Sequence, residues 1–519
     1  MKTTIFLLII YILVGCTPGT NQEIQKPNII YIFADDLGYG ELGTYGQQKI
    51  ETPNIDALAQ NGMKFTNHYA GSPVCAPSRY MLLTGKHPGN AYIRSNADRI
   101  IPESVNYDAY DNRYEAALEH PEVEGQISMR SSSVTMAEVL KDAGYVTGAV
   151  GKWGNGGPST EGHPNKQGFD FFYGYLDQWL AHTYYPTHLW KNDQRVMLDN
   201  ELVNPHQELS EELDPYDPES YDQFHNQPSY SAEMMQKETL QFIEDNREDP
   251  FFLYLPTPIP HVSVQAPQRW VDYYLEKFGN DEEPYLGDGY VPVRYPHATY
   301  AAMISYMDEQ VGEIIEHLKD QGIYDNTLIM FSSDNGPASN GGADPDFFDS
   351  AAPFKGGAGW GKGYVTEGGI RVPMIVTWEG HIEAGRTTDH ISALWDIMPT
   401  FSELAGITPP EDIDGISFLP ILKGDENGQK QHEYLYWEFP AYGGQQAVRM
   451  GKWKGIRKNI ISEANLDIEL YDLNADMREQ NNVADQYPEI LNEVKYIMNN
   501  ERTVPELDQF KMRALGDYQ

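Results

Sequence analysis

The sequence predicts an α/β fold: a large, mostly parallel sheet sandwiched by helices, with a smaller C-terminal α+β subdomain that contains a short antiparallel sheet. Three observations support this prediction. Residues 28–33 (NIIYIF) and similar runs are continuously apolar and β-branched, as strands buried on both faces are. These runs alternate with segments of helical periodicity, which indicates parallel strands joined by helices. Beyond residue 405 the runs become short and closely spaced, which favours antiparallel strands.

The elements of the main domain follow from these patterns. A helix is expected from Thr52 to Gly62 and a second over residues 133–143. Apolar residues recur at helical period from Met303 to Leu318, which predicts a third helix over residues 298–321. The buried strands of the main sheet are expected at residues 28–33, 145–150, 251–255, 327–331 and 374–378.

The last part of the chain has a different pattern. A helix over residues 488–499 is expected to pack on a set of short strands. These strands are expected at residues 434–439, 447–450, 453–457 and 469–473. We therefore divide the chain into a main domain over residues 27–405 and a C-terminal subdomain over residues 406–519.

The composition narrows the class of function. The chain has 519 residues, 77 of them acidic and 37 basic, and its net charge is -40. Such a charge excludes nucleic-acid binding through a general basic surface, and an anionic substrate must be held by local positive charge. Hydrophobic residues make up 40% of the chain and aromatic residues 12%, which excludes wholesale disorder.

The N-terminus predicts export. Residues 5–14 form an apolar run that is too short to span a membrane but fits the core of a signal peptide. The run ends in Gly15 and Cys16, and this ending resembles a bacterial lipobox, in which the cysteine is acylated. We predict a lipoprotein signal peptide over residues 1–15 and a polar tether over residues 16–26. The protein is then an exported bacterial lipoprotein, anchored to the membrane on the periplasmic side or at the cell surface; the alternative is an ordinary signal peptide with an incidental cysteine.

Cys75 is the second of only two cysteines in the chain. If Cys16 carries a lipid, Cys75 has no disulfide partner. An unpaired cysteine in an exported protein suggests a reactive side chain.

Polar residues follow several of the predicted strands directly. Asp35 and Asp36 come after the first strand, and Asp334 and Asn335 after the fourth. Ligands bind beyond the carboxyl ends of the strands in such sheets, so we expect these residues in one site, together with Lys152 and His261. Oxygen ligands suit a hard cation such as Ca²⁺ or Mg²⁺, and no cluster of histidine and cysteine in the sequence suggests zinc. Alone, Asp35-Asp36 is better explained as a solvated turn, and the pairing with residues 333–336 (SDNG) after another buried strand favours the metal site.

Together these stretches resemble a known family. Residues 75–79 (CAPSR) resemble the C-x-P-x-R signature of type I sulfatases, which are members of the alkaline phosphatase superfamily. Five further matches occur in the order of the family and extend the resemblance from about residue 26 to residue 499. They are residues 33–38 (FADDLG), 151–153 (GKW), 260–261 (PH), 333–336 (SDNG) and 361–373 (GKGYVTEGGIRVP).

The resemblance implies an alkaline phosphatase-like fold and a sulfuric ester hydrolase. In this family the cysteine that matches Cys75 is oxidised during export to formylglycine (3-oxoalanine), whose hydrated aldehyde is the nucleophile. Pro77 and Arg79 are implied as the signals that a formylglycine-generating enzyme reads. By the same resemblance Ca²⁺, or Mg²⁺ in its place, is held together with residue 75 by Asp35, Asp36, Asp334 and Asn335.

The resemblance also implies roles for the basic residues. Arg79 holds the modified residue, and Lys152 and Lys362 clamp the sulfate oxygens. His261 binds sulfate and helps to protonate the leaving alcohol. A cation and fixed donors of this kind lower the barrier for attack at sulfur, because negative charge builds up on the sulfate oxygens and on the leaving alcohol.

Two positions depart from the family pattern. Many members have histidine after Gly-Lys-Trp, and that histidine is usually assigned to deprotonating the second hydroxyl of the nucleophile; here the position is Gly154. Another histidine, a metal-bound hydroxyl or water are options for its replacement. Pro440 stands where many carbohydrate sulfatases have a histidine, which puts a C-terminal contact to the sugar in doubt.

The substrate is suggested by a short aromatic segment. Residues 178–190 (QWLAHTYYPTHLW) combine polar donors with flat rings, and His182, Tyr185 and His188 are candidate contacts to a sugar. The alternative is a structural loop packed near the site. This segment and residues 151–175 are similar to carbohydrate sulfatases of marine and gut Bacteroidetes. The expected partner is a sulfated poly- or oligosaccharide, such as ulvan, carrageenan or porphyran, with host glycosaminoglycans as an open alternative.

Two rival functions remain open. The first is a phosphate or phosphonate ester hydrolase of the same superfamily, because relatives share the metal site and even the modified cysteine. The second is a non-catalytic surface lipoprotein that only binds glycans, which Gly154 favours.

Overall fold

The computed structural model describes residues 26–98, 101 and 104–518. The predicted signal peptide, most of the tether and Cys16 lie outside the described residues. Within the described residues, ten strands form one large sheet. They are β1 (Asn28–Ala34), β2 (Met63–Tyr69), β3 (Val146–Lys152), β4 (Phe171–Tyr175), β5 (His188–Lys191), β6 (Gln194–Met197), β7 (Phe251–Pro256), β8 (Thr327–Ser333), β9 (Met374–Thr377) and β10 (Arg386–Ala393).

The order across this sheet is β10-β2-β9-β8-β1-β7-β3-β4-β5-β6. The central strands β8, β1, β7, β3 and β4 run parallel, while β9, β5 and β6 run antiparallel to their neighbours. The mostly parallel sheet and its five predicted strands are confirmed. Strands β2, β5, β6 and β10 were not predicted, because their short or half-polar sequences lack the continuous apolar run of a central strand. β4 (FFYGY) was not predicted either, although its sequence is almost entirely aromatic.

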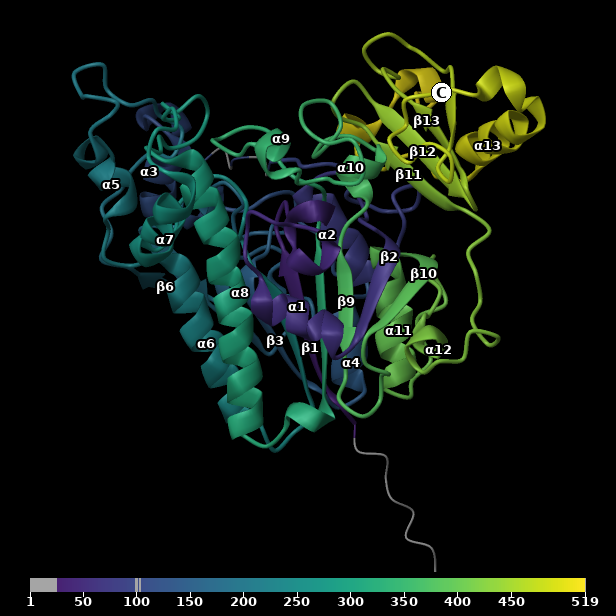
Figure 1. The fold of residues 1–519 in the computed structure, drawn as a ribbon, viewed down its shortest axis with the longest axis horizontal. Helices are drawn as coiled ribbons and strands as arrows, with labels where there is room; N and C mark the ends of the chain where they lie inside the picture. Colours follow the sequence, from purple (N-terminus) through teal and green to yellow (C-terminus); the bar gives the residue numbers. More distant parts are fainter. Residues whose placement is uncertain (1–25, 99–100, 102–103, 519) are drawn as a thin grey trace, which may run out of the picture.

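Helices cover both faces of the sheet. Alternate residues of β1 pack into two separate cores: Ile29, Tyr31 and Phe33 into one, and Ile30 and Ile32 into the other. The helices are α1 (Pro53–Gln60), α2 (Cys75–Thr84), α3 (Arg113–Glu119), α4 (Met136–Asp142), α5 (Asp222–His225), α6 (Ser231–Asp245), α7 (Gln268–Phe278), α8 (Pro296–Asp320), α9 (Pro345–Phe348), α10 (Glu367–Ile370), α11 (Ile397–Leu404), α12 (Leu419–Leu422) and α13 (Pro488–Asn500). Helices α1, α6, α7 and α8 cover one face, and α2, α4, α11 and α12 cover the other (Figure 1).

The three helices predicted in the main domain are present as α1, α4 and α8. Helix α4 shows why the sequence places a helix there. The Thr135 side chain accepts from the backbone N–H of Glu138, and the Glu138 carboxylate accepts from the backbone N–H of Thr135. This reciprocal pair satisfies two donors that a helix start otherwise leaves free.

The C-terminal region forms the predicted antiparallel sheet, in the order β11 (Leu435–Phe439), β12 (Gln445–Met450), β13 (Trp453–Arg457) and β14 (Glu469–Asp472). One face of this sheet packs on α13 through Tyr436, Val448 and Leu470. The other face, with Trp437 and Ile456, belongs to the same core as the main sheet. Both sheets therefore share a core, and the division at residue 405 stays a prediction.

In the part of the chain that the structure describes, none of the helices combines the length and the hydrophobicity that a membrane span requires.

Candidate active site

The carboxyl ends of the central strands bring the predicted residues together. Ala34 of β1 pairs with Ser333 of β8, so the pairs that follow, Asp35-Asp36 and Asp334-Asn335, begin side by side. The backbone N–H of Asp36 donates to Asp334 Oδ1 over 3.0 Å, which fixes the two strand ends to each other. This juxtaposition is a consequence of the parallel register, in which adjacent strands end at one edge.

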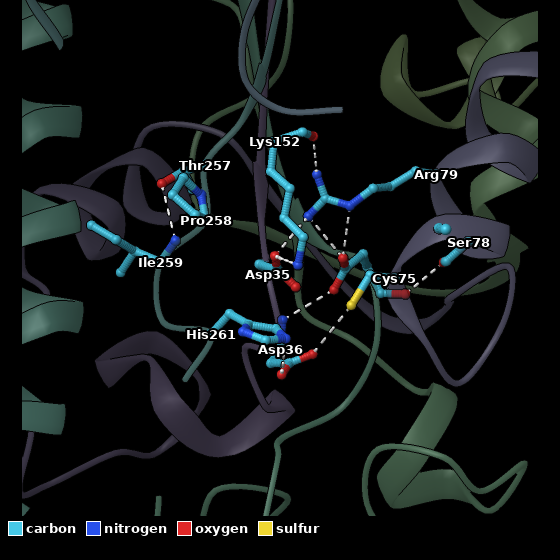
Figure 2. A network of polar contacts seen from close by, with 12 residues as sticks. Asp35, Asp36, Cys75, Ser78, Arg79, Lys152, Thr257, Pro258, Ile259 and His261 are labelled. Carbon is cyan, nitrogen blue, oxygen red and sulfur yellow. Dashed lines mark hydrogen bonds and ion pairs between the residues drawn. The ribbon is translucent and has the colours of Figure 1, made fainter. Parts of the chain in front are cut away.

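Helix α2 supplies the two residues of the cysteine motif. Cys75 is the first residue of α2, and Arg79 lies one turn later on the same face. The guanidinium of Arg79 donates twice to Asp334 Oδ2, at 3.0 and 2.9 Å, and Nη2 lies 3.2 Å from Asp35 Oδ2. Its third nitrogen donates to the Lys152 carbonyl over 2.6 Å (Figure 2). A fully buried arginine is tolerated here because every nitrogen has an acceptor.

Two lysines and one histidine complete the cluster. Lys152 Nζ, at the end of β3, lies 2.6 Å from Asp35 Oδ2, and Lys362 Nζ lies 2.6 Å from Asp36 Oδ2. His261, beyond the end of β7, places Nε2 3.7 Å from Asp36 Oδ2. The Cys75 Sγ lies 3.9 Å from Asp36 Oδ1 (Figure 2). All nine residues predicted for nucleophile, metal and sulfate therefore lie in one cluster.

The donor set of this cluster fits a hard divalent cation. Oδ1 of Asp35 and Oδ1 of Asn335 are buried and have no hydrogen-bond partner in the described part of the chain. Buried polar atoms are rarely left without a partner, so two such oxygens beside further carboxylates indicate that this group of oxygens binds a cation. Burial, and then the neighbouring Asp35, raise the pKa of Asp334 to about 7. Repulsion among carboxylates of this kind is what a cation relieves, and oxygen donors suit Ca²⁺ or Mg²⁺.

The electrostatics of Cys75 are unfavourable for a thiolate. Burial, followed by the charge of Asp35, raises the pKa of the Cys75 thiol well above its usual range. A thiol is a nucleophile only as its thiolate, so the unmodified side chain is inert here at neutral pH.

Four residues of the cluster line a cavity of about 430 Å³, which is of the size that holds small-molecule ligands. Cys75, Lys152, His261 and Lys362 lie on its wall. The cavity wall also includes residues that the sequence did not single out, because they come from separate loops with no motif of their own. Among them are Asn96, Asp98, Gln126, Tyr290, Asn340 and Tyr442. Gln178 and Trp179, from the aromatic segment 178–190, and Tyr364, from the motif at residues 361–373, also line the cavity.

The three candidate sugar contacts have different environments. His182 lines the cavity and its ring stacks on that of His261, with centroids 5.2 Å apart. Tyr185 and His188 are not part of the cavity wall. The Tyr185 ring packs against Tyr230, and buried His188 at the start of β5 lies 3.1 Å from a carboxylate oxygen of Glu124. Tyr185 and His188 therefore fit the alternative interpretation, in which this segment is a structural loop packed near the site.

Gly154, where many family members have histidine, has φ +79°, a conformation that favours glycine. A Cβ atom at this position would lie 2.8 Å from Cγ of Gln178. Gln178, itself on the cavity wall, thus fills the space beside residue 154.

Residues 27–407 match the sulfatase family model, and residues 356–503 match the model of the C-terminal region of N-sulphoglucosamine sulphohydrolase. The chain is 32% identical over 418 residues to N-acetylgalactosamine-6-sulfatase of Homo sapiens, covering 78% of this chain and 67% of that protein. It is 30% identical to N-acetylgalactosamine-6-O-sulfatase of Bacteroides thetaiotaomicron, over 95% of this chain and 97% of that protein.

Among solved structures, Ps i-CgsB superimposes with a TM-score of 0.70 at 27% sequence identity, covering 93% of this chain and 94% of that one. The same TM-score, identity and coverage hold for its complex with k-i-k-neocarrahexaose. The fold and the site define a hydrolase of the alkaline phosphatase-like class. Within that class the chain belongs to the sulfatase family and is a sulfuric ester hydrolase.

Proposed function

We propose that this sulfatase removes sulfate from a sulfated carbohydrate, an algal polysaccharide of the carrageenan, porphyran or ulvan type or its oligosaccharides. The observation that carries the proposal is the cavity, in which Cys75 lies together with Lys152, Lys362 and His261. The similarity to Ps i-CgsB, with its bound k-i-k-neocarrahexaose, supports carrageenan among the three polysaccharides. The N-acetylgalactosamine-6-sulfatases among the relatives leave a glycosaminoglycan as the competing substrate.

Residue 75 acts as formylglycine in this proposal. Two observations support the conversion: the motif from Cys75 to Arg79, and the burial of the unmodified thiol, which together with Asp35 raises its pKa and keeps it protonated. When present, the hydrated aldehyde supplies a hydroxyl that attacks sulfur and a second hydroxyl that allows sulfate to leave.

The metal in this proposal is Ca²⁺, with Mg²⁺ as its substitute. Asp35, Asp36, Asp334 and Asn335 would hold it, because they carry the clustered carboxylates and both orphaned oxygens. A bound cation supplies Lewis-acid stabilisation of the sulfate oxygens.

The chain's own residues position the sulfate and move the proton. Lys152, paired with Asp35, and Lys362, paired with Asp36, offer two point charges to the sulfate oxygens. The Nδ1–H of His261 donates to the Val262 carbonyl, so Nε2 is the atom free to deliver a proton to the leaving alcohol oxygen. Burial, followed by Lys152 and Lys362, lowers the pKa of His261 to about 3. A bound sulfate ester would oppose this effect, because its negative charge favours the imidazolium.

The test begins with the peptide that contains Cys75, taken from protein produced together with a formylglycine-generating enzyme. We expect its mass to show the aldehyde, and the protein to release sulfate from 4-nitrophenyl sulfate and from carrageenan oligosaccharides. Faster release of phosphate from 4-nitrophenyl phosphate would support the rival ester hydrolase. Binding of oligosaccharides without sulfate release, in protein whose residue 75 is proven modified, would support the non-catalytic alternative.

We also propose that the protein is a membrane-anchored lipoprotein, exported to the periplasmic side or the cell surface. The run of residues 5–14 followed by Gly15 and Cys16 supports this. Radioactive palmitate should label the wild-type protein and not a Cys16→Ser variant. Equal labelling of both proteins would contradict acylation at this residue.

A further inference from the structure

His182 lies in a fixed position beside the sulfate-binding residues. Its ring stacks on His261, with an interplanar angle of 10°. Trp179, His206 and Tyr290 each place a ring centroid 5.0–5.2 Å from that of His182. The main chain is held as well, because Ser263 Oγ donates to the His182 carbonyl over 2.7 Å. A ring enclosed by four others has little freedom to turn.

The hydrogen bonds of this cluster determine which ring nitrogens carry protons. His206 Nδ1 lies 2.6 Å from the Gly289 carbonyl oxygen, which can only accept, so the proton is on Nδ1 of His206. In a neutral His206, Nε2 is then an acceptor. This Nε2 lies 3.0 Å from Nδ1 of His182, which must therefore be the donor. The consequence is a His182 whose Nε2 has no proton.

The charge state of both rings supports this assignment. Burial lowers the pKa of His206, although the bond to Gly289 opposes the effect. Burial, and then the charge of His261, lowers the pKa of His182 further. Both rings are therefore neutral at neutral pH. A protonated His206 would reverse the direction of the bond and place the proton of His182 on Nε2.

From this geometry we infer that His182 is a specificity-determining residue whose Nε2 accepts a hydrogen bond from a free hydroxyl of the sugar, close to the sulfate ester. The inference rests on the proposed function. A hydroxyl satisfies this acceptor, whereas a second sulfate, a carboxylate or an acetamido oxygen at the same place would leave two acceptors facing each other. His206 is a positioning residue, since it acts only through His182.

The first experiment observes the tautomer directly and needs no activity. Two-bond ¹H–¹⁵N correlation spectra of ¹⁵N-histidine-labelled protein distinguish a protonated Nδ1 from a protonated Nε2, and a His182→Ala variant assigns the signals. We expect Nδ1 of His182 to carry the proton in the wild type. His206→Gln should keep this state, because its side-chain oxygen can accept in place of Nε2. His206→Leu should lose it, and a proton on Nε2 of wild-type His182 would overturn the inference.

The second experiment measures selectivity with methyl β-galactoside 6-sulfate and three analogues, in which fluorine replaces the hydroxyl at carbon 2, 3 or 4. Fluorine keeps the size of the hydroxyl and cannot donate. We expect kcat/KM to fall about tenfold for one analogue, the loss of one hydrogen bond to a fixed acceptor. In His182→Ala and His206→Leu, the ratio of kcat/KM between the hydroxyl substrate and this analogue should come close to one, while His206→Gln should keep the tenfold ratio of the wild type. His381→Ala, which removes an exposed histidine stacked on Trp378, is the matched control and should keep it too.

The two experiments separate the inference from the function on which it rests. Equal kcat/KM for all four galactosides in the wild type would overturn the inference and leave the sulfatase activity established. Failure to release sulfate from any galactoside would contradict a galactose-type substrate, and a proton on Nε2 of His182 in the tautomer spectra would still overturn the inference.

Discussion

Two of the regions that bury several charges differ in whether those charges are satisfied. Where the C-terminal sheet meets the main domain, Glu438 accepts from Arg94 Nη1 over 2.9 Å and also pairs with Arg502. Arg502 in turn pairs with Asp517 at 2.7 and 2.9 Å, and Arg94 also donates to the Ala91 carbonyl and to Thr503. This network, which we call the junction, is closed. In the active site, Oδ1 of Asp35 and of Asn335 have no partner in the described chain.

The difference shows how to recognise a site among buried charges. A closed network such as the junction holds two parts of the chain together and has no capacity for a further ligand. An incomplete network is costly unless something else completes it. Between these two regions, the orphaned oxygens distinguish the active site more clearly than the number of its charges does. Three predictions test this distinction, from the largest expected effect to the smallest, and a fourth concerns a buried histidine outside both regions.

Cys75→Ala should reduce sulfate release by at least about a thousandfold, because it removes the nucleophile itself. The fold should remain, since a small side chain at the first residue of α2 is shortened by one atom. Sulfate release and Tm measure the two effects, and we expect Tm to shift by less than about 4 °C. A variant that is insoluble, or one that retains full activity, would contradict this prediction.

Removal of divalent cations with a chelator should lower kcat by about a hundredfold or more, because the carboxylate cluster then lacks its cation. Added Ca²⁺ should restore activity, and Mg²⁺ tests whether the site discriminates between the two ions. Tm should fall on chelation, since a ligand that binds only the folded state stabilises it. Metal analysis of the treated protein is the control. Full activity in protein shown to be free of metal would contradict the metal site.

Glu438→Ala should destabilise the protein by about 3–5 kcal/mol, because it leaves Arg94 and Arg502 buried without their shared carboxylate. Unfolding in urea measures this change. The matched control is Glu426→Ala, which removes an exposed partner of Arg386 and should cost less than about 1 kcal/mol. The kcat of folded Glu438→Ala should match the wild type. Equal stability of the two variants would mean that the junction contributes nothing.

The fourth prediction concerns acid stability. Burial lowers the pKa of His68 to about 3, against about 6.5 for a free histidine, so the unfolded chain binds a proton that the folded chain does not. The contribution of neutral His68 to the free energy of unfolding is therefore complete above pH 6.5 and is lost as pH falls toward 3. Between pH 6.5 and pH 4 the free energy of unfolding falls by about 3 kcal/mol for this reason. His68→Gln should weaken the decline in Tm over this range, and an unchanged decline would contradict the assignment.

Most of the fold could be predicted because its central strands are buried on both faces and therefore have continuous apolar sequences. The edge strands could not. β5 begins at His188 within an aromatic segment, and β6 (QRVM) has no buried face to reveal its period. Antiparallel pairing with a neighbour, rather than a pattern of its own, makes each of them a strand.

The residues of the candidate site also fall into two groups, those that could be located from the sequence and those that could not. Residues that follow a strand directly, such as Asp35 and Asp334, could be located from sequence because the end of a strand fixes their place. Gln126 and Tyr290 could not, because only the tertiary fold brings their loops to the cavity. His188 was misleading for a related reason: sequence cannot tell an aromatic donor on a cavity wall from one buried against Glu124.

The burial of α2 also has a consequence for the order of events in the life of the chain. Every residue from Cys75 to Thr84 is buried, so another enzyme cannot reach this motif in the finished protein. If Cys75 is converted to formylglycine, the conversion must precede closure of the fold around it. Folding then competes in time with maturation. A chain that folds too early is trapped as a stable, inactive protein with its thiol enclosed, and slower folding would raise the active fraction.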